Sequence, residues 1–258
     1  MIPPELPAYL ATAYLAGEAE ALRRAAEGWG EERWSCPRIS IIVPTHNEER
    51  YLPRLLRSLE RQGCSNIEVI IVDWSSTDRT IETAQRWGDE TGIDVIVMSA
   101  TARGVGYASW LGETATNGDI IVRTDADTEW PPGLLRRAVE AVQRGAKLYW
   151  AAFTWYDADP VTTLFTWVAR HFRDPCRPHG RFMAVDRSVE GKRSIFNPEL
   201  DVGEDVEVGE WICREFGRDA VVYDRDAVVL TSARRLYAAG VIPYLTGEEF
   251  KIGFPPRR

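Results

Sequence analysis

Lysine, histidine and cysteine are scarce in this chain. Only three of its 258 residues are lysine and three are histidine, and its four cysteines are Cys36, Cys64, Cys176 and Cys213. Consecutive cysteines are 28, 112 and 37 positions apart, so none forms the CxxC pair of a zinc site or a thiol-exchange centre. The histidines also lack zinc-ligand spacing. We therefore expect no zinc site, and four reduced thiols as in a cytoplasmic protein.

Long apolar runs and an excess of basic residues are missing too. No stretch approaches the roughly 18 apolar residues of a membrane-spanning helix, and the first residues lack the basic start of a secretory signal. The formal net charge of −8 at pH 7 disfavours a general nucleic-acid binder, which needs a basic surface to displace counterions from phosphates. The expected location is cytoplasmic, either free or in peripheral contact with the inner face of a membrane.

A regular alternation of short apolar runs and helical patterns begins at residue 38. The runs RISIIV, IEVIIV, IDVIVM and DIIVR are each followed by a segment with helical features. Repeated βα units predict an α/β fold, with a Rossmann-like, mostly parallel sheet and helices on both faces. Pro53 and the pair Pro131-Pro132 suit first helical turns, and the hydroxyls of the Ser-Ser-Thr run at 75–77 suit an N-cap.

Polar residues follow the ends of these predicted strands, where ligands bind in open α/β sheets. The first strand leads into PTHNEE at 44–49, the second into DWSSTD at 73–78 and the fourth into TDAD at 124–127. In a continuing strand Asp125 and Asp127 would point to the same side. Their hard oxygens suit Mg²⁺ or Mn²⁺, with positions left for substrate phosphates. The DxD pattern alone is weak, because it also occurs as a plain helix-capping turn.

The remaining segments are less regular, with a turn-rich stretch at 173–203 and a helical pattern near 206–216 that has Glu204 and Asp205 at its head. Residues 1–34 have the spacing of a helical arm, 35–240 form one predicted domain, and 241–258 form a tail. Residues 170–193 hold seven basic residues against three acidic ones, whereas 199–210 hold six acidic residues and no basic one. Such adjacent fields suit an anionic ligand beside a cation, although both segments are also typical of ordinary solvated surface.

Taken in order, the motifs resemble the family 2 glycosyltransferases, enzymes of GT-A fold that move a sugar from a nucleoside diphosphate sugar to an acceptor with inversion. ISIIVPTHNEERYLPRLLRSL resembles the family's opening strand and helix, IEVIIVDWSSTDRT its second nucleotide-binding turn and DIIVRTDADT its metal strand. GEDVE at 203–207 resembles the acidic motif that supplies the base, and PHGRFMAVDRS resembles the loop before it. The resemblance runs from about Ile39 to Arg235, and it implies a nucleotide-sugar-binding half at 35–130 and a mixed, acceptor-binding half at 131–240.

The resemblance also implies individual roles. Asp205 would be the catalytic base with Glu204 as the alternative, because a bare hydroxyl is a weak nucleophile. Asp127 and Asp125 would hold Mn²⁺ or Mg²⁺ against the donor diphosphate, whose developing charge the ion offsets, and Asp125 would also approach the ribose. The other donor-binding residues implied are Pro44, Thr45, Asn47, Glu48, Asp73, Ser75, Arg103, Ala126, Arg234 and Arg235.

Two positions depart from the family's usual pattern. Trp74 stands where a second adjacent acid is common, and it either stacks near the nucleobase or, as we favour, packs against the next helix. TSARR at 231–235 stands where many relatives carry a histidine. Its two arginines suit a diphosphate, since guanidinium groups bind phosphate in a bidentate manner and stay charged, but they also suit a plain helix start.

The basic segment at 170–193 lies next to Phe165, Trp167 and Phe172 in the sequence. Charge beside apolar rings suits an acceptor with a phosphate and a lipid chain, such as a polyprenyl-phosphate-linked acceptor in contact with a membrane. A saccharide acceptor, with the arginines closing over the donor diphosphate, is the alternative. The sugar, the choice between UDP and GDP, and the oligomeric state are not specified by these patterns.

Three other functions agree less well with the sequence. A haloacid-dehalogenase-like phosphatase shares a DxD after a strand but needs Thr or Val where Glu129 stands. A dinucleotide oxidoreductase needs GxGxxG, and Gly104-Val105-Gly106 lacks the third glycine. A catalytically inactive nucleotide-sugar-binding module is the remaining alternative, and the presence of both Asp127 and Asp205 argues against it.

Overall fold

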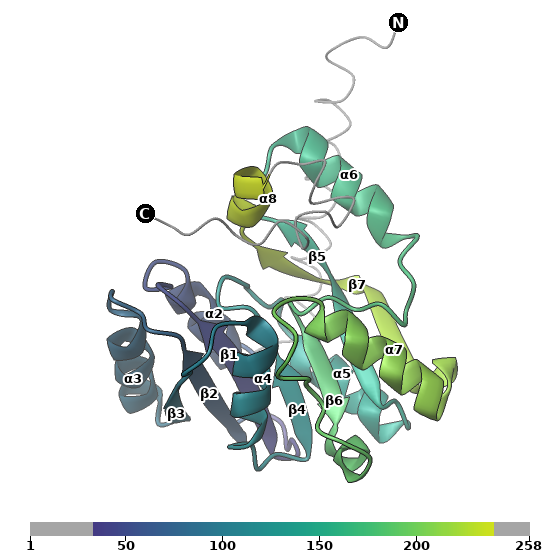
Figure 1. Cartoon of the computed structure of the whole chain (residues 1–258), viewed down its shortest axis with the longest axis horizontal. Coiled ribbons are helices and arrows are strands. Elements are labelled where there is room, and N and C mark those ends of the chain that lie inside the picture. The colour runs from purple at the N-terminus through teal and green to yellow at the C-terminus, as the bar shows by residue number, and fades with distance from the viewer. Residues whose placement is uncertain (1–32, 240–258) are drawn as a thin grey trace, which may run out of the picture.

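Seven strands form one sheet in the structure, a computed structural model that describes residues 33–239 (Figure 1). The order across the sheet is β3-β2-β1-β4-β6-β5-β7. The first four strands are parallel, β6 is antiparallel to both of its neighbours, and β7 is parallel to β5. The predicted α/β architecture with a mostly parallel sheet is confirmed. The strands are β1 (Ile39–Thr45), β2 (Ile67–Asp73), β3 (Asp94–Ser99), β4 (Ile120–Arg123), β5 (Leu148–Trp155), β6 (Met183–Asp186) and β7 (Val221–Thr231).

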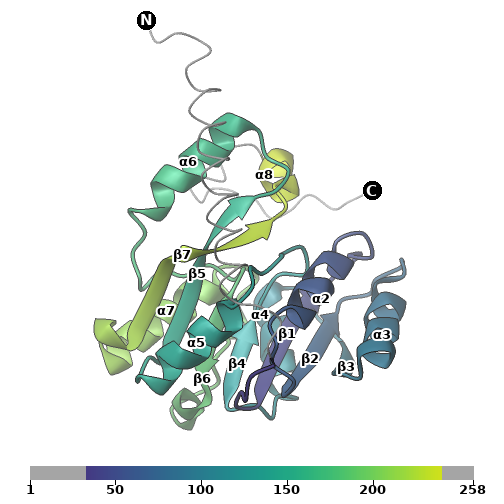
Figure 2. The same ribbon diagram turned by 180° about the vertical axis from the view of Figure 1, so that it is seen from behind.

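Helices cover both faces of the sheet, as Figures 1 and 2 show from opposite sides. The α-helices are α2 (Leu52–Glu60), α3 (Thr80–Thr91), α4 (Val105–Glu113), α5 (Leu134–Gln143), α6 (Pro160–Arg170), α7 (Glu204–Phe216) and α8 (Arg234–Ala239). Alternate residues of β1 enter two separate cores: Ile41 and Val43 pack in the core of α2, α3 and α5, whereas Ile42 packs in that of α4 and α7. This burial on both faces explains why the parallel strands are nearly continuous apolar runs.

The carboxyl ends of the parallel strands gather the polar loops at one edge. Thr45 at the end of β1 is in register with Asp73 at the end of β2, and β4 lies on the other side of β1. The antiparallel β6 starts at this same edge, because Met183 pairs with Arg123 at the end of β4. The fold therefore brings the loop before β6 to the loops that the sequence predicted to form a site.

The helix starts agree only in part with prediction. Pro53 lies in the first turn of α2, as expected. Pro131 and Pro132 precede α5, which begins after Gly133. The predicted N-cap at 75–77 is wrong, because α3 begins after Arg79 and no side chain caps it. The Ser76 and Thr77 hydroxyls instead bond to Asn47 in the loop after β1.

Strand β6 was missed by the sequence patterns, which predicted only turns for 173–203. It has four residues, too few for a periodic signal, and its antiparallel pairing depends on β4 and β5 at distant positions in the chain.

The four cysteines form two disulfides, so the prediction of reduced thiols is wrong. Cys36 pairs with Cys64, and Cys176 pairs with Cys213. The Cα atoms are 5.8 and 5.9 Å apart, within the range that disulfide geometry requires, so the fold supplies a closeness that sequence spacing did not indicate. The cysteine argument for a cytoplasmic location therefore falls away.

The predicted helical arm and the C-terminal tail lie almost wholly outside the described residues. Within 33–239, no helix has the length and apolar character that crossing a membrane requires.

Candidate active site

The loops after β1 and β2 are bonded to each other. The Thr45 hydroxyl donates to the Asp73 carboxylate at 3.0 Å, and the Ser76 backbone N–H donates to the same carboxylate at 2.9 Å. The Asn47 backbone N–H donates to the Ser76 hydroxyl, and the Asn47 side-chain oxygen Oδ1 accepts from the Thr77 N–H, both at 2.8 Å. Thr45, Asn47 and Asp73 are thus brought together, with their side chains already holding the loops.

Two residues in these loops have a left-handed backbone although neither is glycine. Asn47 has φ 55° and Ser75 has φ 52°. Such conformations cost on the order of 1 kcal/mol or more each and concentrate at ligand sites. Pro44 is half-buried at the end of β1, whereas Ser75 is exposed.

Trp74 lies between a core and the site edge. It is half-buried and packs against the core of α4 and α7, while its ring centre lies 4.7 Å from that of His46. The guanidinium carbon of the exposed Arg103 lies 5.7 Å from the Trp74 ring centre. Trp74 therefore packs, but in the core of α4 and α7 instead of against the next helix, α3, and it also forms an aromatic and cationic surface with His46 and Arg103.

The two aspartates after β4 have different partners. Asp125 forms an ion pair with Arg123 at 2.7 Å, whereas Asp127 accepts from the Thr231 hydroxyl at 3.1 Å and pairs with Arg234 at 3.2 Å. Strand β4 ends at Arg123, so both aspartates lie in the following turn and strand alternation does not orient them. Ala126 between them is buried.

Arg234 connects Asp127, in the turn after β4, to the loop after β1. Its guanidinium also bonds to Glu48, from the loop after β1, and lies over the Tyr51 ring. The other carboxylate oxygen of Glu48 is buried without a hydrogen-bond partner. Arg235, which follows Arg234 in the sequence, is exposed. The pair Arg234–Glu48 spans 186 positions of sequence and could be found only once the fold was known.

The acidic pair Glu204-Asp205 begins α7, with its side chains turned toward the same edge. One Asp205 oxygen accepts from the Gly180 N–H at 2.6 Å and the other from the Val206 N–H at 2.7 Å. Glu204 is buried and pairs with Arg123 at 3.1 Å. The predicted helix is confirmed, and it runs from Glu204 to Phe216.

Arg123 is the group that connects the two acidic motifs. Its side chain is only 4% exposed, and it contacts Asp125 of the metal motif, Glu204 of the base motif and the Gly180 carbonyl oxygen. Gly180 lets Arg123 approach closely, since a Cβ there would lie 1.9 Å from an Arg123 nitrogen and would force that side chain to move. The sequence analysis missed Arg123, although an arginine at the end of a buried strand is an unusual signal.

Burial shifts the pKa values of these acids. Burial, strengthened by the charge of Asp205, raises the pKa of Glu204 to about 7. Burial also raises the pKa of Asp205, and burial together with the charge of Asp125 raises that of Asp127. For Asp125 the effect of burial is outweighed by nearby arginines, mainly Arg123, so its pKa is lowered.

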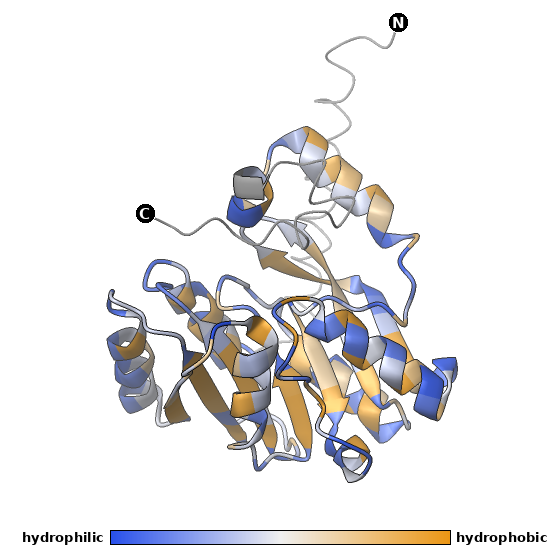
Figure 3. Cartoon of the chain, in the orientation of Figure 1, coloured by the Kyte–Doolittle hydropathy of each residue, from blue (hydrophilic) through white to orange (hydrophobic). Residues whose placement is uncertain are grey.

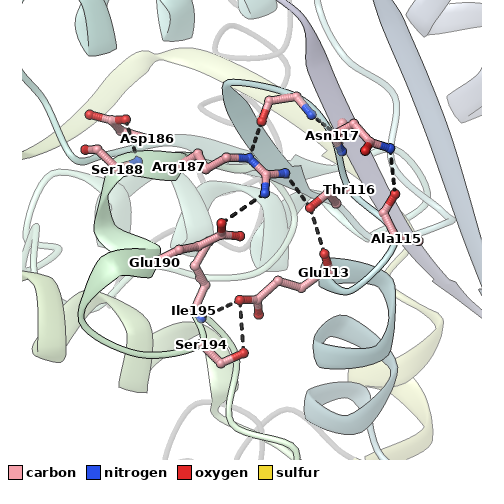
Figure 4. Close-up of polar contacts among 12 residues, drawn as sticks. Glu113, Ala115, Thr116, Asn117, Asp186, Arg187, Ser188, Glu190, Ser194 and Ile195 are labelled. Atoms are coloured by element: carbon pink, nitrogen blue, oxygen red, sulfur yellow. Dashed lines mark hydrogen bonds and ion pairs between the residues drawn. The ribbon is translucent and has the colours of Figure 1, made fainter.

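Helix α4 holds the segment that leads into α7. Figure 4 shows the contacts at the end of α4, from Glu113 to Ser194 and Ile195. At its start, the N–H groups of Val105 and Gly106 donate to the carbonyl oxygens of Asp201 and Leu200 at 3.3 and 3.1 Å. At its end, the buried Glu113 carboxylate accepts from the N–H groups of Ile195 and Phe196 at 2.8 and 3.1 Å and from the Ser194 hydroxyl at 3.0 Å. Helix α4 thus holds both ends of 194–201, the segment that precedes Glu204 and Asp205.

The basic residues of 170–193 have several different partners. Arg177, Arg187 and Arg193 pair with Glu210, Glu190 and Glu207. Arg181 lies over the rings of Phe153 and Trp155, at 3.9 and 5.0 Å from their centres, and Arg173 lies 5.9 Å from the Phe153 ring centre. Only part of the predicted charge is therefore at the site edge.

The carboxylate oxygens at this edge suit a divalent ion that is also bound by a substrate. Asp127 and Asp125 offer hard oxygens, and the unpartnered Glu48 oxygen is a further buried acceptor beside Arg234. Within the described residues no cluster of three or more potential ligands occurs. Mg²⁺ and Mn²⁺ suit such a site, since Mg²⁺ in particular is commonly held by one or two carboxylates plus phosphate oxygens and water.

The fold and the clustered acids define a GT-A-type α/β protein, and comparison with solved structures agrees. The mannosyltransferase PcManGT from Pyrobaculum calidifontis, solved in complex with GDP-Man and Mn²⁺, matches with a TM-score of 0.60. The match covers 95% of this chain and 76% of that chain at 21% identity, which shows a shared GT-A fold. The model of glycosyl transferase family 2 matches residues 40–195. The chain therefore belongs to glycosyl transferase family 2.

Curated relatives share a shorter region. A dolichol-phosphate mannosyltransferase of Pyrococcus furiosus is 33% identical over 113 residues, which are 43% of this chain and 32% of the relative. An undecaprenyl-phosphate 4-deoxy-4-formamido-L-arabinose transferase of Pseudomonas paraeruginosa is 32% identical over 112 residues, 42% of this chain and 33% of the relative. The chain spans about a third of the length of each of these two relatives.

Proposed function

We propose that this protein is an inverting glycosyltransferase that moves a sugar from UDP- or GDP-sugar to an acceptor hydroxyl, with Mn²⁺ or Mg²⁺ as cofactor. The observation that carries the proposal is the joining of the metal motif and the base motif by Arg123 at one sheet edge, in a chain of this family. Asp205 is the proposed base, and Asp127 with Asp125 would hold the metal. A bound divalent cation would offset charge on the departing nucleoside diphosphate.

The donor side has a surface for each part of a nucleotide sugar. The side chains of Trp74, His46 and Arg103 offer a stacking surface to a nucleobase. The hydrogen-bonded loops that contain Thr45, Asn47 and Asp73 lie next to them. The Arg234 guanidinium would bind the diphosphate, either while it still pairs with Asp127 or after that ion pair breaks. These contacts support a nucleotide-sugar donor and leave the sugar open.

The acceptor side supports a lipid-phosphate-linked acceptor more than a free saccharide. Arg181 and Arg173 lie over the Phe153 ring, and the charge of Arg181 acts on both Asp125 and Asp127. The names of both curated relatives contain a polyprenyl phosphate. Together these facts support an acceptor carried on a lipid, reached by peripheral contact with a membrane.

Asp127→Ala tests the metal and donor assignment. We expect UDP or GDP to bind the wild type with Mn²⁺ in calorimetry or thermal shift, and to bind at least roughly tenfold more weakly after EDTA treatment or in the variant. Asp219→Ala, an exposed aspartate remote from the site edge, is the matched control. Undiminished binding in Asp127→Ala would remove Asp127 from the metal site. Donor binding without any sugar transfer or donor hydrolysis would instead favour the inactive nucleotide-sugar-binding module.

A further inference from the structure

Helix α6 is amphipathic with its polar side toward the protein. Thr163 and Thr166 are buried, and the Trp155 indole N–H of β5 donates to the Thr166 hydroxyl at 2.8 Å. The opposite side and the residue just beyond the helix expose apolar side chains: Val161 is 59% exposed, Phe165 51%, Val168 42% and Phe172 83%. A surface helix of a globular protein normally has the reverse arrangement. We call these four residues the α6 stripe.

The α6 stripe is continuous and isolated from the rest of the surface. Its members are spaced by four, three and four positions, so they lie along one side of the helix. Among the described residues, the only other large apolar side chain with comparable exposure is Tyr237 of α8, whose hydroxyl bonds to Asp159 at the start of α6. Figures 1 and 2 show α6 beside the far ends of β5 and β7, away from the main body of the sheet, and Figure 3 shows apolar colour along it.

The charges around α6 suit an anionic lipid surface. The helix contains no acidic residue, and Arg170 and Arg173 lie at its C-terminal end. The acids on either side are engaged: Asp159 caps the helix by accepting from the Val161 and Thr162 N–H groups, and Asp174 pairs with Arg218. An apolar stripe with basic residues at one end suits a helix that lies in a membrane interface.

The stripe is too small for a stable protein interface. Its four side chains expose on the order of 400 Å², about half of the roughly 800 Å² that each partner buries in a standard complex. A bilayer sets no such requirement, because each inserted side chain contributes by itself.

The stripe is also connected to the candidate active site. Thr166 on the inner side of α6 contacts Trp155, and Arg181 lies over Trp155 while its charge acts on Asp125 and Asp127. If a membrane lay against the outer side of α6, only that helix and Trp155 would therefore separate it from Arg181, which is proposed to bind the acceptor.

From this arrangement we infer that the α6 stripe is the surface by which the protein docks on a lipid bilayer, so that the acceptor reaches the site from the membrane. The inference rests on the proposed transfer to a lipid-borne acceptor, but the docking itself can be measured without any acceptor.

Vesicle flotation of the full chain tests the inference, with phosphatidylcholine vesicles that contain or lack phosphatidylglycerol. We expect the wild type to bind the anionic vesicles at low salt, and the Phe165→Ser/Phe172→Ser variant to bind roughly tenfold less or worse. Phe165→Leu/Phe172→Leu keeps the stripe apolar and should retain most of the binding. Arg170→Ala/Arg173→Ala should weaken binding to anionic vesicles, whereas Arg177→Ala, whose arginine pairs with Glu210, should not.

Three results would overturn the inference. They are no wild-type binding at low salt, equal binding by the serine and leucine pairs, and a wild-type dimer in solution that the serine pair converts to a monomer. Calorimetry of UDP or GDP with Mn²⁺ on the same variants separates this test from the proposed function. Loss of vesicle binding with intact nucleotide binding concerns α6 alone, whereas absence of nucleotide binding in the wild type would count against the donor assignment.

Discussion

Arg123 and Arg234 each hold two carboxylates at the same sheet edge, but in different surroundings. The Arg123 side chain is 4% exposed and lies between Asp125 and Glu204, which come from the two acidic motifs. The Arg234 side chain is 22% exposed and lies between Glu48 and Asp127. Water screens the second cluster more than the first.

The difference indicates which contacts are permanent. Removing Arg123 would leave the buried Glu204 carboxylate without its cation, so we interpret its cluster as a fixed part of the fold. Arg234 has one side open and can exchange Asp127 for another anion, such as a diphosphate. The base side of the site is therefore built in advance, whereas the donor side is adjustable.

The largest effect should come from removing the base while leaving both arginine clusters intact. Asp205→Asn should lower sugar transfer by roughly 10²- to 10⁴-fold, because no group then takes the acceptor proton, and donor affinity should stay nearly unchanged. Steady-state kinetics and nucleotide calorimetry measure the two quantities. Glu207→Gln, two residues along the same helix and paired with Arg193, is the control. Turnover that survives in Asp205→Asn would assign the role to Glu204 or another acid.

Stability measurements compare the two arginines directly. Arg123→Met should lower the free energy of unfolding by about 3–5 kcal/mol, the usual result of breaking a buried ion pair. Arg234→Met should lower it by only about 1–2 kcal/mol, since water can reach the gap. Urea unfolding measures both. Adding Glu204→Gln to Arg123→Met should recover part of the loss, and equal losses for the two single variants would abolish the distinction between the clusters.

The pH dependence of stability tests the Glu204 side of the Arg123 cluster. The pKa of Glu204, about 7 in the folded protein against an ordinary 4.5, means that the native state keeps a proton that the unfolded chain releases. The free energy of unfolding should therefore fall as pH rises from about 4.5 to 7, by up to about 3 kcal/mol from this group. Glu204→Gln should flatten that slope and Glu207→Gln should not. An unchanged slope in Glu204→Gln would mean that the proton is held elsewhere.

Local patterns predicted the part of the molecule built from local rules. The runs that became β1 to β4 are apolar on both faces, and parallel strands alternating with helices can gather their loops only at one edge. The approach of Thr45 to Asp73 and the position of Glu204 at a helix start followed from those rules. These features depend on neighbours in the sequence or on adjacent parallel strands.

Features that depend on distant residues were not accessible to the same reasoning. The pairing of Arg234 with Glu48, the burial of Arg123 and the four-residue strand β6 each arise from segments far apart in the chain. The cysteines illustrate this most clearly: spacing excluded a CxxC motif but carried no information about which sulfur atoms the fold brings together. The basic segment at 170–193 was divided for the same reason, since Glu190, Glu207 and Glu210 take up three of its arginines.

The bond between Cys176 and Cys213 makes a closed covalent ring of the chain between them. Gly180 and Asp205, which are hydrogen-bonded to each other, both lie inside this ring. A protease that cuts once at the exposed Lys192 would open the ring without releasing a fragment. The nicked protein would migrate as two pieces only after reduction. The disulfide would keep Asp205, the proposed base, joined to the loop of Gly180 after a cut that would separate the two parts of a chain without this bond.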